Sequence, residues 1–166
     1  MIQLITFLIL ITVGQTIVTD QKTSDKNFAL IDDFERNKTT FRTDEYDLSG
    51  HSTEGGQLVA FHNKDKDYIV VDIWIFGEMG KVNATYWMDK KLNFIIVKRA
   101  DFQYDKPFYE KDFKATETVK YLSYNSDNVK GYDNERKQLT DSLTTEIKEK
   151  YEELFKDLTK DLKIVK

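Results

Sequence analysis

The chain has no cysteine among its 166 residues, one proline and two histidines. Without cysteine, disulfides, thiol chemistry and an acylated N-terminal cysteine are all excluded. A hydrophobic core must therefore supply the stability of any folded domain. For an exported protein, the lack of disulfides is more typical of a bacterial periplasm or cell exterior than of a eukaryotic secretory route.

The sequence also lacks a large excess of either positive or negative charge. The sequence carries 25 basic and 29 acidic residues, a formal net charge of −4, and the two signs are mixed along the chain. Binding to phosphate backbones requires a basic surface. We therefore expect no nucleic-acid partner.

Long hydrophobic runs are absent except at the start of the chain. Residues 1–18 contain a continuous apolar core of about ten residues, whereas a membrane-spanning helix needs roughly 20. Small, polar and then charged residues follow, which is the order of a secretory signal peptide, although no Lys or Arg precedes the core. We predict a signal peptide at 1–19 and a periplasmic or secreted protein, with an uncleaved anchor as the alternative. One domain at 20–166 should follow, with a flexible linker at 21–27.

Three apolar runs between residues 68 and 104 organise this domain. Residues 68–76 are rich in β-branched and aromatic side chains on both faces, which predicts a central strand that needs cover on both sides. Short turns lead to the runs at 81–88 and 92–104, as in consecutive hairpins. With a strand at 57–62 and a weaker one at 116–124, we expect an antiparallel β-meander of four or more strands.

Two helices are predicted outside the sheet, which makes the fold class α+β. Phe28, Leu30, Ile31 and Phe34 share the face of a short helix that ends near Asn37. Residues 37–56 then form a loop, and no structure is assigned to most of 106–131. Near the C-terminus, apolar residues recur every three or four positions and predict an amphipathic helix, capped by Asp133 or Asn134, that covers one face of the sheet. They are Leu139, Leu143, Ile147, Tyr151, Leu154, Leu158 and Leu162.

Motifs for catalysis or metal binding are incomplete. His51 and Glu54 have the spacing of an inverted zinc site, but Gly55 stands where the second histidine belongs. Residues 63–67 alternate like a calcium loop, but Tyr68 replaces its glycine. We assign no catalytic residue, metal or cofactor. A small secreted hydrolase with a carboxylate pair is the alternative, because any of 29 acidic residues could meet in space.

Aromatic residues of the predicted sheet are the best binding candidates, because exposed aromatic rings form interface hot spots and ligand platforms. We select Trp74, Tyr86, Trp87 and Tyr104. Trp87 shares a strand face with polar residues and is expected to face solvent. Asp72 lies within an apolar strand, where an ionised carboxylate must find partners. These features favour a monomeric, non-catalytic binding protein of the bacterial envelope, with an envelope protein, peptide, glycan or lipid as partner.

Two short motifs carry a resemblance. They are Ser52-Thr53-Glu54-Gly55-Gly56 and Phe76-Gly77-Glu78-Met79-Gly80-Lys81. Here the chain resembles a group of uncharacterised small exported bacterial proteins whose sheets carry an S-x-E-G-G strand start and an F-G-E-x-G-K turn. The similarity covers about 52–107. It implies export and a β-meander, and it identifies no functional residues.

Overall fold

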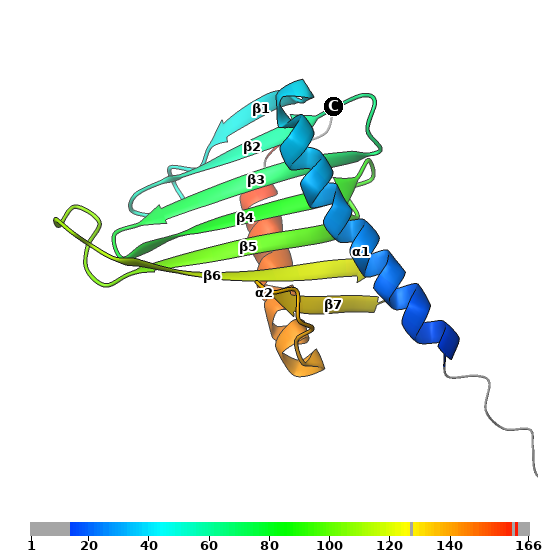
Figure 1. Cartoon of the computed structure of the whole chain (residues 1–166). Coiled ribbons are helices and arrows are strands. Elements are labelled where there is room, and N and C mark those ends of the chain that lie inside the picture. Colours follow the sequence, from blue (N-terminus) through cyan, green and yellow to red (C-terminus); the bar gives the residue numbers. More distant parts are fainter. Residues whose placement is uncertain (1–13, 127, 161, 163–166) are drawn as a thin grey trace, which may run out of the picture.

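The structure is a computed structural model that describes residues 14–126, 128–160 and 162, with side chains from residue 26 onward (Figure 1). Residues 1–13 of the predicted signal peptide lie outside the described residues. Residues 14–19 belong to the first helix. Within the described part, no helix combines the length and apolar character that a membrane span requires.

A seven-stranded sheet forms the centre of the described chain, and each strand pairs antiparallel with the next in sequence. The β-meander and the α+β class are therefore confirmed. The strands are β1 (Arg42–Asp47), β2 (Gly56–His62), β3 (Tyr68–Gly77), β4 (Gly80–Asp89), β5 (Phe94–Tyr104), β6 (Ala115–Asn125) and β7 (Asn128–Asp133).

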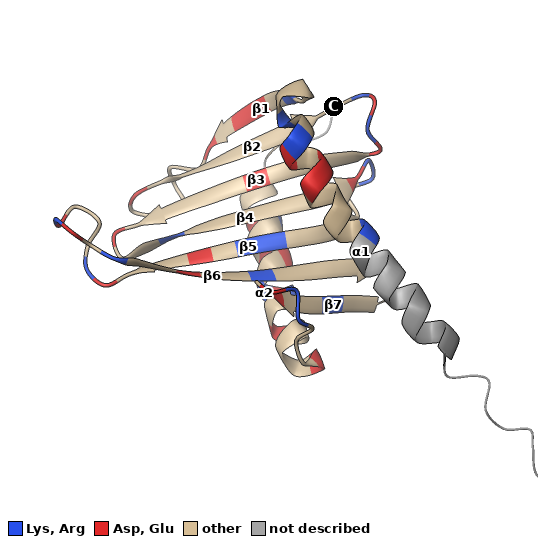
Figure 2. Cartoon of the chain, in the orientation of Figure 1, with Lys and Arg blue, Asp and Glu red and all other residues tan. Residues whose placement is uncertain are grey.

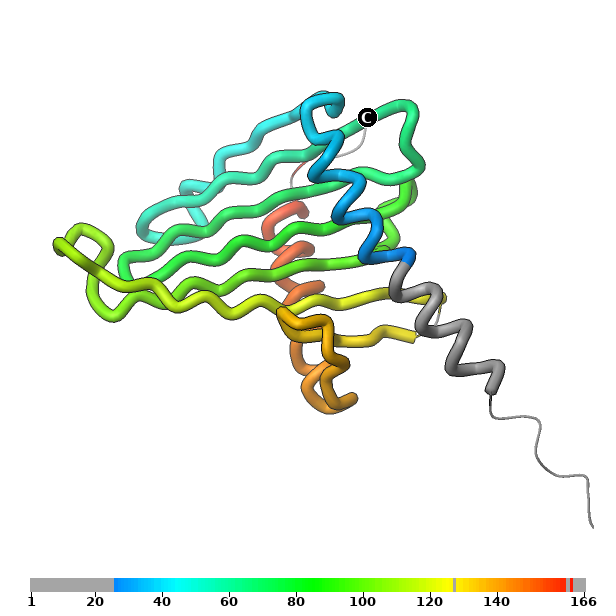
Figure 3. Tube along the Cα trace, viewed as in Figure 1, coloured from blue at the N-terminus to red at the C-terminus, as the bar shows by residue number. Residues whose placement is uncertain are grey.

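Two helices lie on opposite faces of this sheet (Figures 1 and 3). The helix α1 (Gly14–Asn37) crosses one face diagonally, and a short 3-10 turn at Lys38–Thr40 leads from it into β1. The helix α2 (Asp141–Thr159) crosses the other face. The central strand β3 thus has a helix on each side, although α1 covers only part of its length.

The core under α2 follows from the apolar positions of that helix. Ile147, Tyr151 and Phe155 are buried against inward-facing side chains of β2 to β6. Thr140 caps the helix, since its hydroxyl accepts a hydrogen bond from the Leu143 backbone N–H at 3.4 Å. The prediction of a cap at Asp133 or Asn134 is wrong. Asp133 is the last residue of β7, and its backbone N–H donates to the Lys137 carbonyl.

The core under α1 is mainly aromatic. Phe34 makes edge-to-face contacts with Phe41, Phe61 and Trp87 at centroid distances of 5.3, 5.1 and 6.0 Å. Asn27 is only 5% exposed, and its amide Nδ2 lies within 2.9–3.1 Å of the Ser123 hydroxyl and the carbonyls of Ile95 and Tyr124. These contacts attach α1 to β5 and β6.

Three segments differ from their prediction. Residues 21–27, expected as a linker, are part of α1. The loop expected at 37–56 contains β1, an edge strand whose charged sequence gives no apolar signal. The strand β7, which was not predicted, is short and contains Gly131, where an added Cβ would meet the Thr144 hydroxyl of α2 at 2.7 Å.

Candidate functional site

The two helices leave part of the sheet uncovered, at the end that holds the β3–β4 turn and the β5–β6 loop (left in Figure 1). On the face that α1 crosses, three aromatic rings and one ammonium group gather in this region. We call Trp74, Phe76, Lys81 and Phe102 the aromatic cluster. Strand alternation and register place them together, because Phe76 pairs with Lys81 and Lys81 pairs with Phe102 across the sheet.

The rings of the aromatic cluster are nearly parallel. The Trp74 centroid lies 6.2 Å from that of Phe76 and 6.2 Å from that of Phe102, with interplanar angles of 13° and 21°. The Lys81 ammonium lies 4.9 Å from the Trp74 ring centre and 4.8 Å from that of Phe102. Such distances are those of cation–π contacts. The Phe76 side chain is 38% exposed, so the cluster is open to solvent.

Asp72 holds Trp74 in its orientation. Its carboxylate accepts hydrogen bonds from the Trp74 indole N–H at 3.1 Å, the Asn83 amide at 2.8 Å and the Thr85 hydroxyl at 2.7 Å. Asn83 and Thr85 lie on β4 and are themselves buried. The isolated carboxylate in the apolar strand therefore has three partners, and one of them is a ring of the aromatic cluster.

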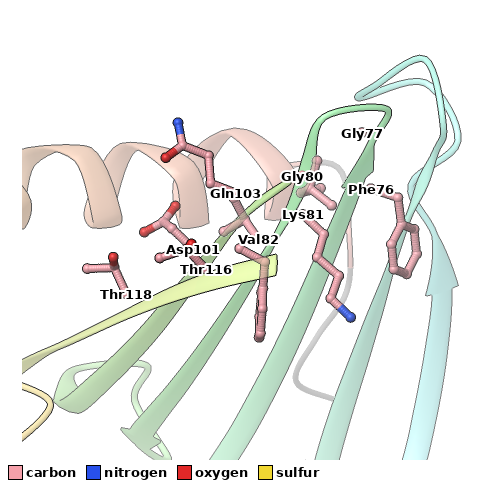
Figure 4. A pocket seen from close by; sticks show the side chains of 11 residues that line it. Phe76, Gly77, Gly80, Lys81, Val82, Asp101, Gln103, Thr116 and Thr118 are labelled. Carbon is pink, nitrogen blue, oxygen red and sulfur yellow. The ribbon is translucent and has the colours of Figure 1, made fainter. Parts of the chain in front are cut away.

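The opposite side of the same sheet end carries a shallow depression of about 580 Å³ (Figure 4). Asp101, Gln103 and Thr118 project into it from β5 and β6, whereas Phe76 and Lys81 point to the other side of the sheet. Asp101 pairs with Arg99 at 2.8 Å. Burial alone would lower the pKa of Arg99, but the hydrogen bonds to Asp101 raise it overall. The Asp101 carboxylate therefore already has a cationic partner within its own strand.

Two of the four predicted binding residues are not at the surface. Tyr86 is fully buried under α2, where its hydroxyl donates to the Tyr151 carbonyl at 2.9 Å and burial raises the pKa of its phenol. Trp87 is 1% exposed, so the expectation that it faces solvent is wrong. The physical reason is that Phe34 of α1 packs against the Trp87 ring and covers it. Neither side chain can touch a ligand from solution.

The other two predicted residues lie in or beside the candidate site. Trp74 is at the centre of the aromatic cluster. Tyr104 is partly exposed, and its ring centroid lies 4.9 Å from that of Phe113 in the β5–β6 loop. Phe102 and Lys81 were missed because their proximity depends on the pairing of β4 with β5. Phe76 could have been found, since it alternates with Trp74 on the same strand face.

His62 gives a testable pH effect at the other end of the sheet. Its imidazole Nε2 lies 3.4 Å from the Asp44 carboxylate, but burial outweighs that charge and lowers the pKa of His62 below its usual 6.5. The unfolded chain therefore takes up the proton first as the pH falls. The contribution of His62 to stability is complete above pH 6.5 and is lost as the pH falls through the lowered pKa.

We expect the proton NMR titration of this imidazole to have its midpoint below pH 6.5. A His51→Gln background leaves His62 as the one histidine in the chain, so the resonance is assigned without ambiguity. Asp44→Asn should lower the midpoint further, because it removes the charge that favours the imidazolium. A midpoint at or above 6.5 would contradict the burial effect.

The described residues contain no group of three or more His, Cys, Asp or Glu side chains able to hold a metal ion. Comparison of the chain with models of protein families, with curated proteins and with solved structures gives no match.

Proposed function

We propose that the protein is an exported, non-catalytic binding protein and that a carbohydrate chain binds across the aromatic cluster. The observation that carries the proposal is the set of near-parallel rings of Trp74, Phe76 and Phe102 beside the Lys81 ammonium, on a part of the sheet that neither helix covers. Export rests on the signal-like sequence of residues 1–19, which favours the periplasm or the cell exterior.

The chemistry of the cluster suits sugar rings. The face of an aromatic ring is electronegative and attracts the polarised C–H groups on one side of a pyranose. Sugar hydroxyls need polar partners nearby, and Lys81 supplies a donor while Gln57, opposite Trp74 on β2, supplies both donors and an acceptor. An open surface, in contrast to an enclosed pocket, lets a long chain pass over it.

The hydrogen bonds of the nearby carboxylates favour binding over hydrolysis. Asp72 already accepts three hydrogen bonds, so it is a structural acceptor for Trp74 and its neighbours. The depression on the opposite face is lined by one carboxylate, Asp101, and this group is paired with Arg99. Glycoside hydrolysis generally requires two carboxyl groups facing one bond. The hydrolase alternative therefore has no specific support.

Tryptophan fluorescence tests the proposal directly, because the two tryptophans differ in exposure. Trp87 is buried and Trp74 is partly exposed, so a ligand on the cluster should change the emission of Trp74 alone. We expect titration with soluble polysaccharides such as mannan, xylan or dextran to produce a saturable change with at least one of them. Trp74→Ala should weaken binding at least about tenfold, as expected for a central aromatic anchor.

Binding by Trp74→Ala must be followed by a method independent of fluorescence, such as affinity electrophoresis in a polysaccharide gel. Leu92→Asn is the matched control, since Leu92 is exposed at the opposite end of the sheet and its positive φ of 68° suits asparagine. Retention of full affinity by Trp74→Ala, or no binding to any of the polysaccharides, would overturn the carbohydrate assignment. Release of shortened sugars would instead support the hydrolase.

A further inference from the structure

Exposed apolar side chains gather at one end of the molecule. Of the six large hydrophobic side chains exposed in the described part of the chain, five lie at the sheet end that projects beyond both helices (Figure 1). They are Phe76, Met79, Phe108, Tyr109 and Phe113, and the sixth, Leu92, lies at the opposite end. Met79 belongs to the β3–β4 turn, and the last three belong to the β5–β6 loop. We call Met79, Phe108, Tyr109 and Phe113 the apolar tip.

Backbone hydrogen bonds hold the apolar tip in place. The Phe108 N–H bonds to the Glu78 carbonyl at 3.1 Å and the Tyr104 N–H to the Met79 carbonyl at 2.9 Å, so the loop is attached to the neighbouring turn. The Asp105 N–H bonds to the Lys114 carbonyl at 3.1 Å and closes the base of the loop. Tyr109 is nevertheless 67% exposed and Met79 49% exposed. The fold therefore presents these side chains to the outside instead of burying them.

The surroundings of the apolar tip have no excess of basic side chains. The loop at 105–114 holds three acidic and three basic residues, and Figure 2 shows both signs along it. Glu78, in the neighbouring turn, adds a further negative charge, and its carboxylate accepts a hydrogen bond from the Tyr109 hydroxyl. An anionic partner would therefore find no net electrostatic attraction at the tip. The tip is also small, with four exposed side chains, whereas a stable protein interface uses about 20–30 residues on each side. These features argue against a nucleic acid, a charged membrane or a large protein surface.

We propose that the apolar tip inserts into the interfacial layer of a lipid bilayer with uncharged or zwitterionic headgroups. Phe and Met side chains partition into the apolar boundary, and the tyrosine ring suits the headgroup level, where aromatic residues concentrate in membrane proteins. The lysines beside them can extend toward water while their stems lie along apolar surface. The tip is distinct from the aromatic cluster, so this surface does not depend on the carbohydrate ligand.

Flotation with phosphatidylcholine vesicles tests this proposal. We expect the mature protein to float with the vesicles, and raising the salt concentration should not release it, because no net charge attraction is involved. The double variant Phe108→Ser, Tyr109→Ser should bind about tenfold more weakly, which corresponds to about 1.4 kcal/mol. Leu92→Asn, at the opposite end, should bind like the unchanged protein.

Two single variants show whether the double variant loses binding only because it misfolds. Tyr109→Ser and Met79→Ser alter different hairpin ends, and each should weaken vesicle binding while the urea unfolding midpoint stays unchanged. Failure to float with phosphatidylcholine vesicles would overturn the proposal. So would binding that requires anionic lipid and falls with salt, or an equal loss in the Leu92→Asn control.

Discussion

Replacing Trp87 by alanine is expected to lower the free energy of unfolding by about 3–5 kcal/mol, the usual cost of emptying a buried aromatic site. Trp87 is 1% exposed and packs edge-to-face against Phe34 of α1 at 6.0 Å. Its strand neighbours Val70 and Ile96 are fully buried as well. The cavity would lie where α1 meets the sheet, so the helix would lose a principal contact.

Urea denaturation monitored by circular dichroism measures this loss, and Trp74→Ala is its matched control. Trp74 is partly exposed and lies beyond the reach of α1, so its removal should cost about 1–2 kcal/mol, mainly through the hydrogen bond to Asp72 and the ring contacts. If Trp87 were on a solvated face, its replacement would change stability by no more than about 0.5 kcal/mol. Equal losses in the two variants would contradict the burial of Trp87.

The two tryptophans show what periodicity in a strand can and cannot predict. Alternation correctly indicates two apolar faces for 68–76, and the helix at 141–159 was found from its apolar spacing. Alternation does not say how far a covering helix reaches. Val70 and Trp74 share one face of β3, yet α1 covers only the end that holds Val70. Trp87 pairs with Val70 and is buried with it.

The extent of α1 was difficult to predict from local sequence, because its polar middle resembles a linker and its beginning overlaps a signal-like segment. The anchoring contact of Asn27 joins residues far apart in the chain, with Ser123 as one partner. Edge strands presented a different difficulty. The charged side chains of β1 discourage pairing with other molecules, and the same charges remove the apolar alternation by which strands are recognised.

The aromatic cluster required knowledge of the strand register. Phe102 meets Lys81 only because β5 pairs with β4 in one particular alignment, and that alignment shifts at Trp87 and Met88. A shift of one residue would send Phe102 to the other face of the sheet. Sequence reasoning could thus identify Trp74 as a candidate and Asp72 as a carboxylate in need of partners. It could not bring Phe102 and Lys81 to the same place.

Gly80→Ala is expected to destabilise the sheet at the upper end of the roughly 1–3 kcal/mol that overpacking costs. A Cβ at Gly80 would lie 2.2 Å from the Phe102 carbonyl oxygen and 3.3 Å from its carbonyl carbon. Both are backbone atoms of β5, so they cannot move aside as the end of a flexible side chain could. The second glycine of the F-G-E-x-G-K turn is therefore explained by the close approach of β4 to β5.

The same substitution should also disturb the aromatic cluster, because the displaced backbone belongs to Phe102 and the residue after Gly80 is Lys81.

Gly50→Ala is the matched control. Nothing lies within 4 Å of its added Cβ, and the smaller conformational entropy of the unfolded chain should make this change neutral or stabilising by up to about 1 kcal/mol. Urea denaturation of the two variants compares them directly. If Gly80→Ala were as stable as Gly50→Ala, β4 and β5 would have to pack less closely than described. In that case only the conformation of the β3–β4 turn would explain a glycine at position 80, and Gly80→Ala should leave carbohydrate binding unchanged.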